Sequence, residues 1–122
     1  MSELFGPFDY NRIVRVFEPK LVGEIISTAI SANTDIFASD LEAVEDGYWI
    51  IKITTDTAGY PIVKETPSGS TSSVTSGLNE SGDLAVNSWY EFWLTGRKGD
   101  KINLQFSADA TVTIRVFFSR SS

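Results

Sequence analysis

The sequence predicts an all-β fold, an antiparallel β-sandwich that is jelly-roll-like. Apolar and polar residues alternate in many short segments that are rich in β-branched and aromatic residues. Gly, Asp, Asn and Ser separate these segments, and no stretch of useful length follows a helical period. Many short antiparallel strands joined by turns are typical of a sandwich or a jelly roll. With 122 residues, of which 42% are hydrophobic, the chain is expected to form one globular core.

The leading segment, residues 1–19, differs in character from the rest of the chain. It is dense in aromatic residues and is bracketed by Pro7 and Pro19. We predict that it is an N-terminal arm or an edge strand, and that residues 20–122 form the β-sandwich domain. Such a segment either completes the sheet of its own chain or docks on a neighbouring subunit. It lacks the basic start and unbroken apolar run of a signal peptide, so we expect the protein to be made and kept in the cytosol.

Eight strands are expected in chain order. Their aromatic and β-branched content, with turn residues on either side, predicts the ranges 11–17, 20–30, 47–56, 60–66, 71–75, 88–96, 101–107 and 110–119. Residues 39–47 favour a short helical turn that Ser39 or Asp40 caps and Gly47 ends. The stretch 67–87 is rich in Ser, Thr and Gly and is expected to hold one short strand within a long loop.

Alternation within the strands assigns side chains to an inner and an outer face. The expected inward positions are Trp49, Ile51, Ile53, Tyr90, Phe92, Leu94, Ile102, Leu104, Phe106, Val112, Ile114, Val116 and Phe118. On the strand that begins at Lys101, the residues expected to point outward are Lys101, Asn103 and Gln105.

Two connections carry clear turn residues. The Ala-Gly pair at 58–59 predicts a hairpin, with Pro61 on an edge strand. Residues 95–101 predict a second turn, in which Gly96 and Gly99 supply positive φ angles.

The strand at 88–96 is unusual because both of its faces carry large aromatic side chains. Trp89 and Trp93 lie on the face that the core does not need, and Tyr48 and Phe117 also fall on outer faces. Three explanations are open: the leading segment covers these rings, they form a subunit interface, or they stack on sugar rings. We favour the subunit interface, because aromatic residues are enriched at the buried centre of interfaces.

Composition excludes several classes of function. The net charge is −6 and no Lys/Arg cluster is present, so neither nucleic acid nor an anionic membrane is an expected partner. The sequence has no cysteine and no histidine, which removes disulfides, zinc sites of the Cys/His type and histidine acid–base chemistry. We therefore expect no enzymatic activity.

An acidic run offers oxygen ligands of the kind that Ca²⁺ prefers. Its members are Asp40, Glu42, Glu45 and Asp46. The run lacks the spacing of a dedicated calcium loop, so we expect a solvated loop and neither metal nor other cofactor.

Three stretches of the chain together resemble small all-β structural proteins of tailed bacterial and archaeal viruses. They read TTDTAGYPIVKETPSG, LNESGDLAVNSWYEFWL and RKGDKINLQFSADATVTIRVFF, and the resemblance covers roughly residues 47–118. It implies a virion component, assembled in the host cytoplasm, that serves as a capsid decoration or another accessory head or tail subunit. It also implies durable, thermostable β structure and a symmetric homo-oligomer.

The expected function is therefore that of a non-enzymatic virion structural protein. Its expected partners are copies of itself, as a dimer or trimer, and a major capsid protein. The residues expected at the interface are Phe5, Phe8, Tyr10, Phe17, Trp89, Trp93 and Phe117. The alternative is a carbohydrate-binding module whose exposed tryptophans bind a glycan, and a third possibility is a monomeric cytosolic domain whose outer face is already covered.

Overall fold

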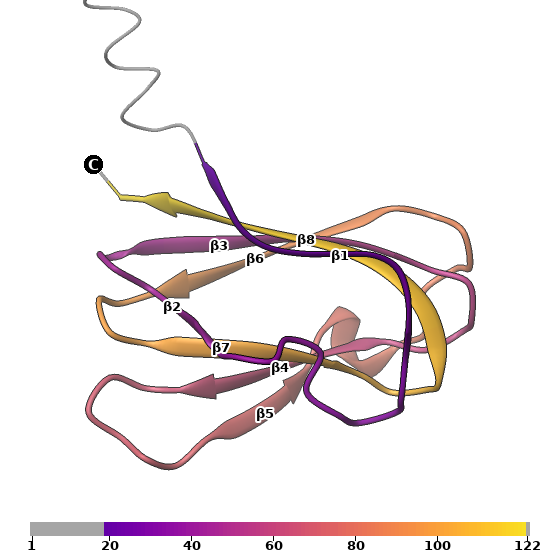
Figure 1. Ribbon diagram of the computed structural model, residues 1–122, viewed down its shortest axis with the longest axis horizontal. Coiled ribbons are helices and arrows are strands. Elements are labelled where there is room, and N and C mark those ends of the chain that lie inside the picture. Colours follow the sequence, from indigo (N-terminus) through magenta and orange to yellow (C-terminus); the bar gives the residue numbers. More distant parts are fainter. Residues whose placement is uncertain (1–18, 122) are drawn as a thin grey trace, which may run out of the picture.

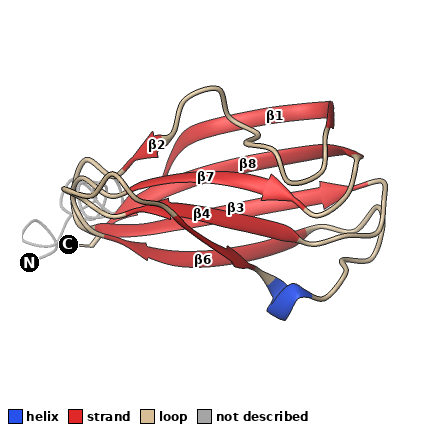
Figure 2. Ribbon diagram, turned by 90° about the horizontal axis from the view of Figure 1, so that it is seen from below, coloured by secondary structure: helices blue, strands red, loops and turns tan. Residues whose placement is uncertain are grey.

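Two four-stranded antiparallel sheets pack face to face as a β-sandwich (Figures 1 and 2). The computed structural model describes residues 19–121. Sheet A contains, in spatial order, β1 (Lys20–Ile30), β8 (Ala110–Arg120), β3 (Gly47–Thr55) and β6 (Tyr90–Gly96). Sheet B contains β2 (Leu41–Glu42), β7 (Lys101–Phe106), β4 (Pro61–Thr66) and β5 (Val74–Gly77), and a short 3-10 helix, η2 (Asn79–Ser81), follows β5.

The all-β prediction is confirmed. Strands β1, β3, β4, β6, β7 and β8 match their predicted ranges closely, whereas the strand expected at 71–75 is displaced to β5. The strand predicted at 11–17 lies outside the described residues.

The pairing of the strands is that of a jelly roll. β1 pairs with β8, β2 with β7, β3 with β6 and β4 with β5, and each pair is antiparallel. This nested pattern corresponds to one long hairpin folded over into two sheets. The β3–β8 and β4–β7 pairs then join the strands of each sheet. Sheet A consequently has β1 and β6 at its edges, and sheet B has β2 and β5.

The connection at 58–59 is not the hairpin that the sequence predicted, because β3 and β4 belong to different sheets. Pro61 is not on an edge strand either, since β4 lies between β7 and β5. Pro61 is buried opposite Phe106, and it is tolerated there because it is the first residue of its strand. Local sequence identifies a turn but does not say which sheet the next strand joins.

The two glycines of the 95–101 turn have different roles. Gly99 has a φ of 91°, as predicted, whereas Gly96 does not have a positive φ. A Cβ atom on Gly96 would lie 2.8 Å from Nε1 of Trp49. The Trp49 ring is buried and makes an edge contact with Phe118, with ring centroids 4.8 Å apart. Gly96 is therefore required by close packing of the core and not by its backbone conformation.

The core lies between the sheets and is built mainly from the predicted inward positions. Tyr90, Phe92 and Leu94 of β6 are half-buried and pack against it. The buried apolar residues include Trp49, Ile51, Ile53, Ile102, Leu104, Phe106, Val112, Ile114, Val116 and Phe118.

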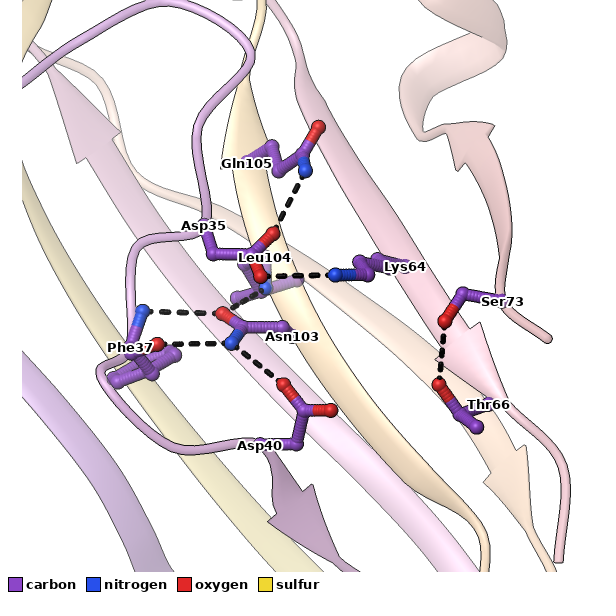
Figure 3. Close-up of polar contacts among 9 residues, drawn as sticks. All are labelled: Asp35, Phe37, Asp40, Lys64, Thr66, Ser73, Asn103, Leu104 and Gln105. Carbon is purple, nitrogen blue, oxygen red and sulfur yellow. Dashed lines mark hydrogen bonds and ion pairs between the residues drawn. The ribbon is translucent and has the colours of Figure 1, made fainter. Parts of the chain in front are cut away.

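Residues 31–40, between β1 and β2, cover the outer side of β7 through the side chain of Asn103 (Figure 3). Asn103 Oδ1 accepts hydrogen bonds from the backbone N–H groups of Phe37 and Leu104, at 3.0 and 2.8 Å. Its Nδ2 donates to the carbonyl of Phe37 and to Asp40, each at 2.9 Å. Asn103 is on the outer side, as expected, but it is only 1% exposed because this segment covers it.

Asp35 ties the same segment to two strands of sheet B (Figure 3). Its carboxylate accepts hydrogen bonds from Gln105 Nε2 of β7 at 2.8 Å and from Lys64 Nζ of β4 at 2.9 Å. The Gln105 amide and the Lys64 ammonium lower the pKa of Asp35, and the carboxylate raises the pKa of Lys64.

The helical turn predicted at 39–47 does not form. Leu41–Glu42 pairs with the start of β7 as β2. The backbone of Ala43 then donates to the carbonyl of Asp100 and accepts from the N–H of Gly99, at 2.8 and 2.7 Å. Pairing with β7 takes the backbone groups that a helical turn would have used.

Candidate interaction surface

The outer side of sheet A carries a cluster of large apolar side chains that we call the aromatic face, formed by Tyr48, Ile50, Trp89, Trp93 and Phe117. Strand register brings them together, because Ile50 of β3 lies opposite Trp93 of β6 on one side and opposite Phe117 of β8 on the other. Ile50 is buried at 6% exposure by these neighbours, although it points away from the core. The face is therefore continuous around Ile50, whereas Trp89 lies on the far side of Lys52 and Glu91, which line the hollows beside both tryptophans.

Trp93 is the most prominent member of the aromatic face and is 57% exposed. Its indole stacks on Tyr48, with ring centroids 4.9 Å apart and an interplanar angle of 17°. Its Nε1 donates a hydrogen bond of 2.6 Å to Glu91 Oε2. The ring borders an open hollow of 380 Å³, whose lining residues are Pro19, Ile50, Lys52, Glu91, Trp93 and Phe117.

Trp89 precedes β6 and is 55% exposed. The guanidinium carbon of Arg115 lies 5.7 Å from the centre of its ring, a cation–π arrangement. Arg115 also pairs with Glu24 at 2.8 Å. A second open hollow, of 390 Å³, lies here and is lined by Lys52, Trp89, Tyr90, Glu91 and Arg115.

The charges on sheet A's outer side are balanced. Lys52 Nζ lies 3.9 Å from Glu91 and 5.4 Å from the centre of the Phe117 ring. Arg115 is balanced by Glu24. Lys52 and Glu91 line both hollows, so this ion pair lies between Trp89 and Trp93. A surface of exposed aromatic rings with balanced charges fits a protein partner better than a polyanion.

The structure brings together three of the predicted interface residues. Trp93 and Phe117 line the same hollow, and Trp89 lines the adjoining one. The other four, Phe5, Phe8, Tyr10 and Phe17, lie outside the described residues. Sequence reasoning did not assign Ile50, Lys52 or Arg115 to the interface, although the alternation that placed Tyr48 and Phe117 outward also places these three outward.

The acidic run does not gather into a metal site. Asp40 binds the Asn103 amide, Asp46 Oδ1 accepts from the N–H of Lys98 at 2.9 Å, and Glu45 pairs with Arg120 at 3.5 Å. Within residues 19–121, no three His, Cys, Asp or Glu side chains come together as metal ligands. In the same part of the chain, no helix is long and apolar enough to cross a membrane.

Asp100 organises the connection from β6 to β7. Its carboxylate accepts from the N–H groups of Arg97 and Ser68, at 3.0 and 2.9 Å. These backbone donors lower the pKa of Asp100. The Lys-Gly-Asp tripeptide at 98–100 thus serves the local structure of the turn.

No protein-family model matches the chain, and no curated protein matches it. Among solved structures, the chain is similar to one from Bacillus endospore appendages, a family of disulfide-linked pili. The two share 16% identity with a TM-score of 0.38, over 87% of this chain and 94% of that one. A likeness this weak does not bear on function.

Proposed function

We propose that this protein is a non-enzymatic structural subunit that assembles with copies of itself, in the manner of a capsid decoration or another accessory head or tail subunit of a virion. The observation that carries the proposal is the exposure of Trp89 and Trp93 on a sheet whose inner face is already filled by core residues. The free energy of the system falls when a second molecule covers large indole rings and removes them from water.

The expected gain is large enough to support assembly. Each aromatic side chain that becomes fully buried contributes on the order of 2–3 kcal/mol, before the ordering cost of association is subtracted. Trp89, Trp93 and the half-buried Phe117 lie over adjacent hollows, so one partner surface can cover all three. Stacking on Tyr48 and the bond to Glu91 hold Trp93 in place, which lowers the entropy lost on binding.

Analytical ultracentrifugation of the purified full chain tests the proposal directly. We expect a dimer or trimer at micromolar concentration, and we expect Trp93→Ala to shift it toward monomer. Val74→Ala is the matched control, because Val74 is 63% exposed but lies on β5 of the other sheet. A wild-type chain that remains a strict monomer at every accessible concentration would refute assembly.

The virion role makes a separate prediction. The chain should remain bound to purified capsid shells through a density gradient, and it should dissociate when Trp93 is replaced by Ala. If the chain self-associated but bound neither a major capsid protein nor particles, the proposal of a structural subunit would stand and the decoration role would be refuted.

Carbohydrate binding is the second candidate, and the hollow beside Trp89 favours it. An exposed indole there adjoins Lys52, Glu91 and Arg115, which are groups able to hydrogen-bond sugar hydroxyls. This candidate predicts a monomer whose tryptophan fluorescence changes when a glycan is added. Loss of that response in Trp89→Ala, with Trp93→Ala still responding, would place the sugar in this hollow.

A further inference from the structure

The four edge strands of the sandwich are protected to very different degrees. β1 has irregular register at two places, between Leu21 and Gly23 and between Ile25 and Thr28. β2 has only two residues, and β5 has four and is followed by the left-handed residues 79–81. Bulges and short length are two of the features by which edge strands avoid pairing with other chains.

β6 has none of these features. Its seven residues pair with β3 in unbroken register, from Gly96 opposite Gly47 to Tyr90 opposite Ile53. β6 ends the strand order of sheet A, and no strand in residues 19–121 pairs with its other side. This edge therefore presents a regular row of backbone donors and acceptors.

The outward side chains of β6 leave this edge clear. Trp93 stacks on Tyr48 of β3, and Glu91 lies near Lys52 of β3. Both therefore lean over their own sheet and away from the open side of β6. On the inner side, Tyr90 and Phe92 stack with ring centroids 6.4 Å apart and pack against the core.

We propose that two copies of this chain pair through β6, antiparallel and about a two-fold axis at Trp93. The inference rests on the proposed function and names a contact between copies at the sheet edge, beside the aromatic face and not over it. A second copy is the fitting partner because, among the edges described, only β6 offers another regular strand of equal length. Trp93 is the midpoint of Tyr90–Gly96, so this register lets all seven residues pair.

Charge is compatible with this register and disfavours pairing about Glu91. Glu91 is the charged residue of β6, and pairing about Trp93 places it opposite Thr95 of the second copy. Pairing about Glu91 would place two carboxylates directly opposite each other, which is destabilising. The paired sheets form one eight-stranded sheet, and the two aromatic faces join on its outer side.

Cysteine cross-linking tests the register cleanly, because the chain has no cysteine of its own. Single variants Glu91→Cys and Thr95→Cys are purified, mixed in equal amounts and mildly oxidised. In the proposed register, residue 91 of one copy faces residue 95 of the other at a separation that a disulfide can bridge. We expect a covalent dimer with one copy of each variant, and almost none from either variant alone, because like positions then lie about 13 Å apart.

Thr75→Cys mixed with Glu91→Cys is the matched control, since Thr75 is exposed on the β5 edge. Cross-linking of that control, or of Glu91→Cys alone, to the same yield would overturn the proposed contact. No cross-link from a chain that sediments as an oligomer would overturn the contact but leave the proposed function standing. A strict monomer would overturn both, and slow hydrogen exchange at β6 in that monomer would show that the chain covers this edge itself.

Charge substitution gives a second, independent measurement on protein that contains no cysteine. Thr95→Lys would face Glu91 of the second copy at two places in the dimer, and Thr95→Glu would place like charges there. We expect the dissociation constant to fall for the lysine variant and to rise about tenfold for the glutamate variant. Equal effects of the two variants, or effects matched by Thr75→Lys and Thr75→Glu, would contradict the contact.

Discussion

Sheets A and B differ in what covers their outer sides. On sheet B, the chain's own segment 31–40 lies over β7, and Asn103 is buried in a set of four hydrogen bonds. On sheet A, Trp89 and Trp93 remain more than half exposed among the described residues. Polar groups on β7 are thus satisfied within the chain, whereas apolar area on sheet A stays exposed among residues 19–121. The cover of β7 contributes to stability, and we propose that the aromatic face serves association.

The largest expected effect comes from removing the cover of sheet B. Asn103→Ala leaves the backbone N–H and carbonyl of Phe37 without their partners in a partly buried place. Because unsatisfied buried polar groups are costly, we expect the free energy of unfolding to fall by about 3 kcal/mol. Urea unfolding followed by fluorescence measures this change.

Gln105→Ala is the control for that variant. Gln105 is a neighbour on β7, but it is only half-buried and its amide donates a single bond, to Asp35. A loss for Gln105→Ala as large as that for Asn103→Ala would show that the buried amide has no special role. The self-association of the folded protein should be unchanged in both variants.

The opposite pattern is expected on sheet A. Trp93→Ala removes the stack on Tyr48, so the free energy of unfolding of the monomer should fall by only about 1 kcal/mol. The association constant should fall by at least about tenfold, because a central aromatic residue is lost from the interface. Unfolding measured at a protein concentration below the dissociation constant gives the effect on the monomer's stability. Sedimentation at concentrations above the dissociation constant gives the effect on association. A variant that loses stability in proportion to its association would show that Trp93 belongs to the fold.

Much of sheet A could be predicted from the sequence because its signal is local. Alternation in SWYEFWL places Tyr90, Phe92 and Leu94 against the core and leaves Trp93 exposed. The strands themselves are short runs of β-branched and aromatic residues, which the sequence reveals directly. The stacking of Trp93 on Tyr48 was not predicted, because it depends on the register between β6 and β3.

The cover of sheet B could not be predicted in the same way. Asn103 reads as an outward polar residue of an alternating strand, and only the distant residues 31–40 make it buried. The hairpin expected at 58–59 failed for a related reason, since the sheet that β4 joins is set by its pairing with β7. Features that depend on contacts far along the chain are the ones that local pattern misses.

The connection from β6 of sheet A to β7 of sheet B has a smaller expected effect on stability, and this effect depends on pH. Asp100 holds the N–H groups of Arg97 and Ser68, and these donors lower the pKa of its carboxyl group. A lowered pKa in the folded state contributes stability that is complete above the ordinary value of 3.8 and is lost as the pH falls through the lowered value. We expect Asp100→Asn to cost about 1 kcal/mol at pH 7.

Thermal unfolding across pH checks this prediction. The difference in Tm between wild type and Asp100→Asn should narrow as the pH falls below 3.8, because the wild-type carboxyl group is then also protonated. Asp83→Asn serves as the control, since Asp83 is exposed and its carboxylate makes no hydrogen bond within residues 19–121. A constant difference across the acid range would mean that the charge of Asp100 does not stabilise the turn.

The smallest expected effect belongs to the ion pair beside the buried amide. The Asp35 carboxylate is 36% exposed and lies 2.9 Å from Lys64, so water screens much of the attraction. Asp35→Asn should cost about 0.5 kcal/mol at neutral pH. Because the pKa of Asp35 is lowered in the folded state, its contribution to stability is complete above about pH 3.8 and is lost at lower pH. Because the pKa of Lys64 is raised, its contribution to stability is complete below 10.5 and is lost as the pH rises beyond that value. Asp35→Ala, which also removes the acceptor for Gln105, separates the hydrogen bond from the charge. The contrary outcome is that Asp35→Asn destabilises the protein as strongly as Asn103→Ala does. That result would show that the cover of sheet B depends on its ion pair. The two sheets would then differ in surface charge and not in the hydrogen bonding of their outer sides.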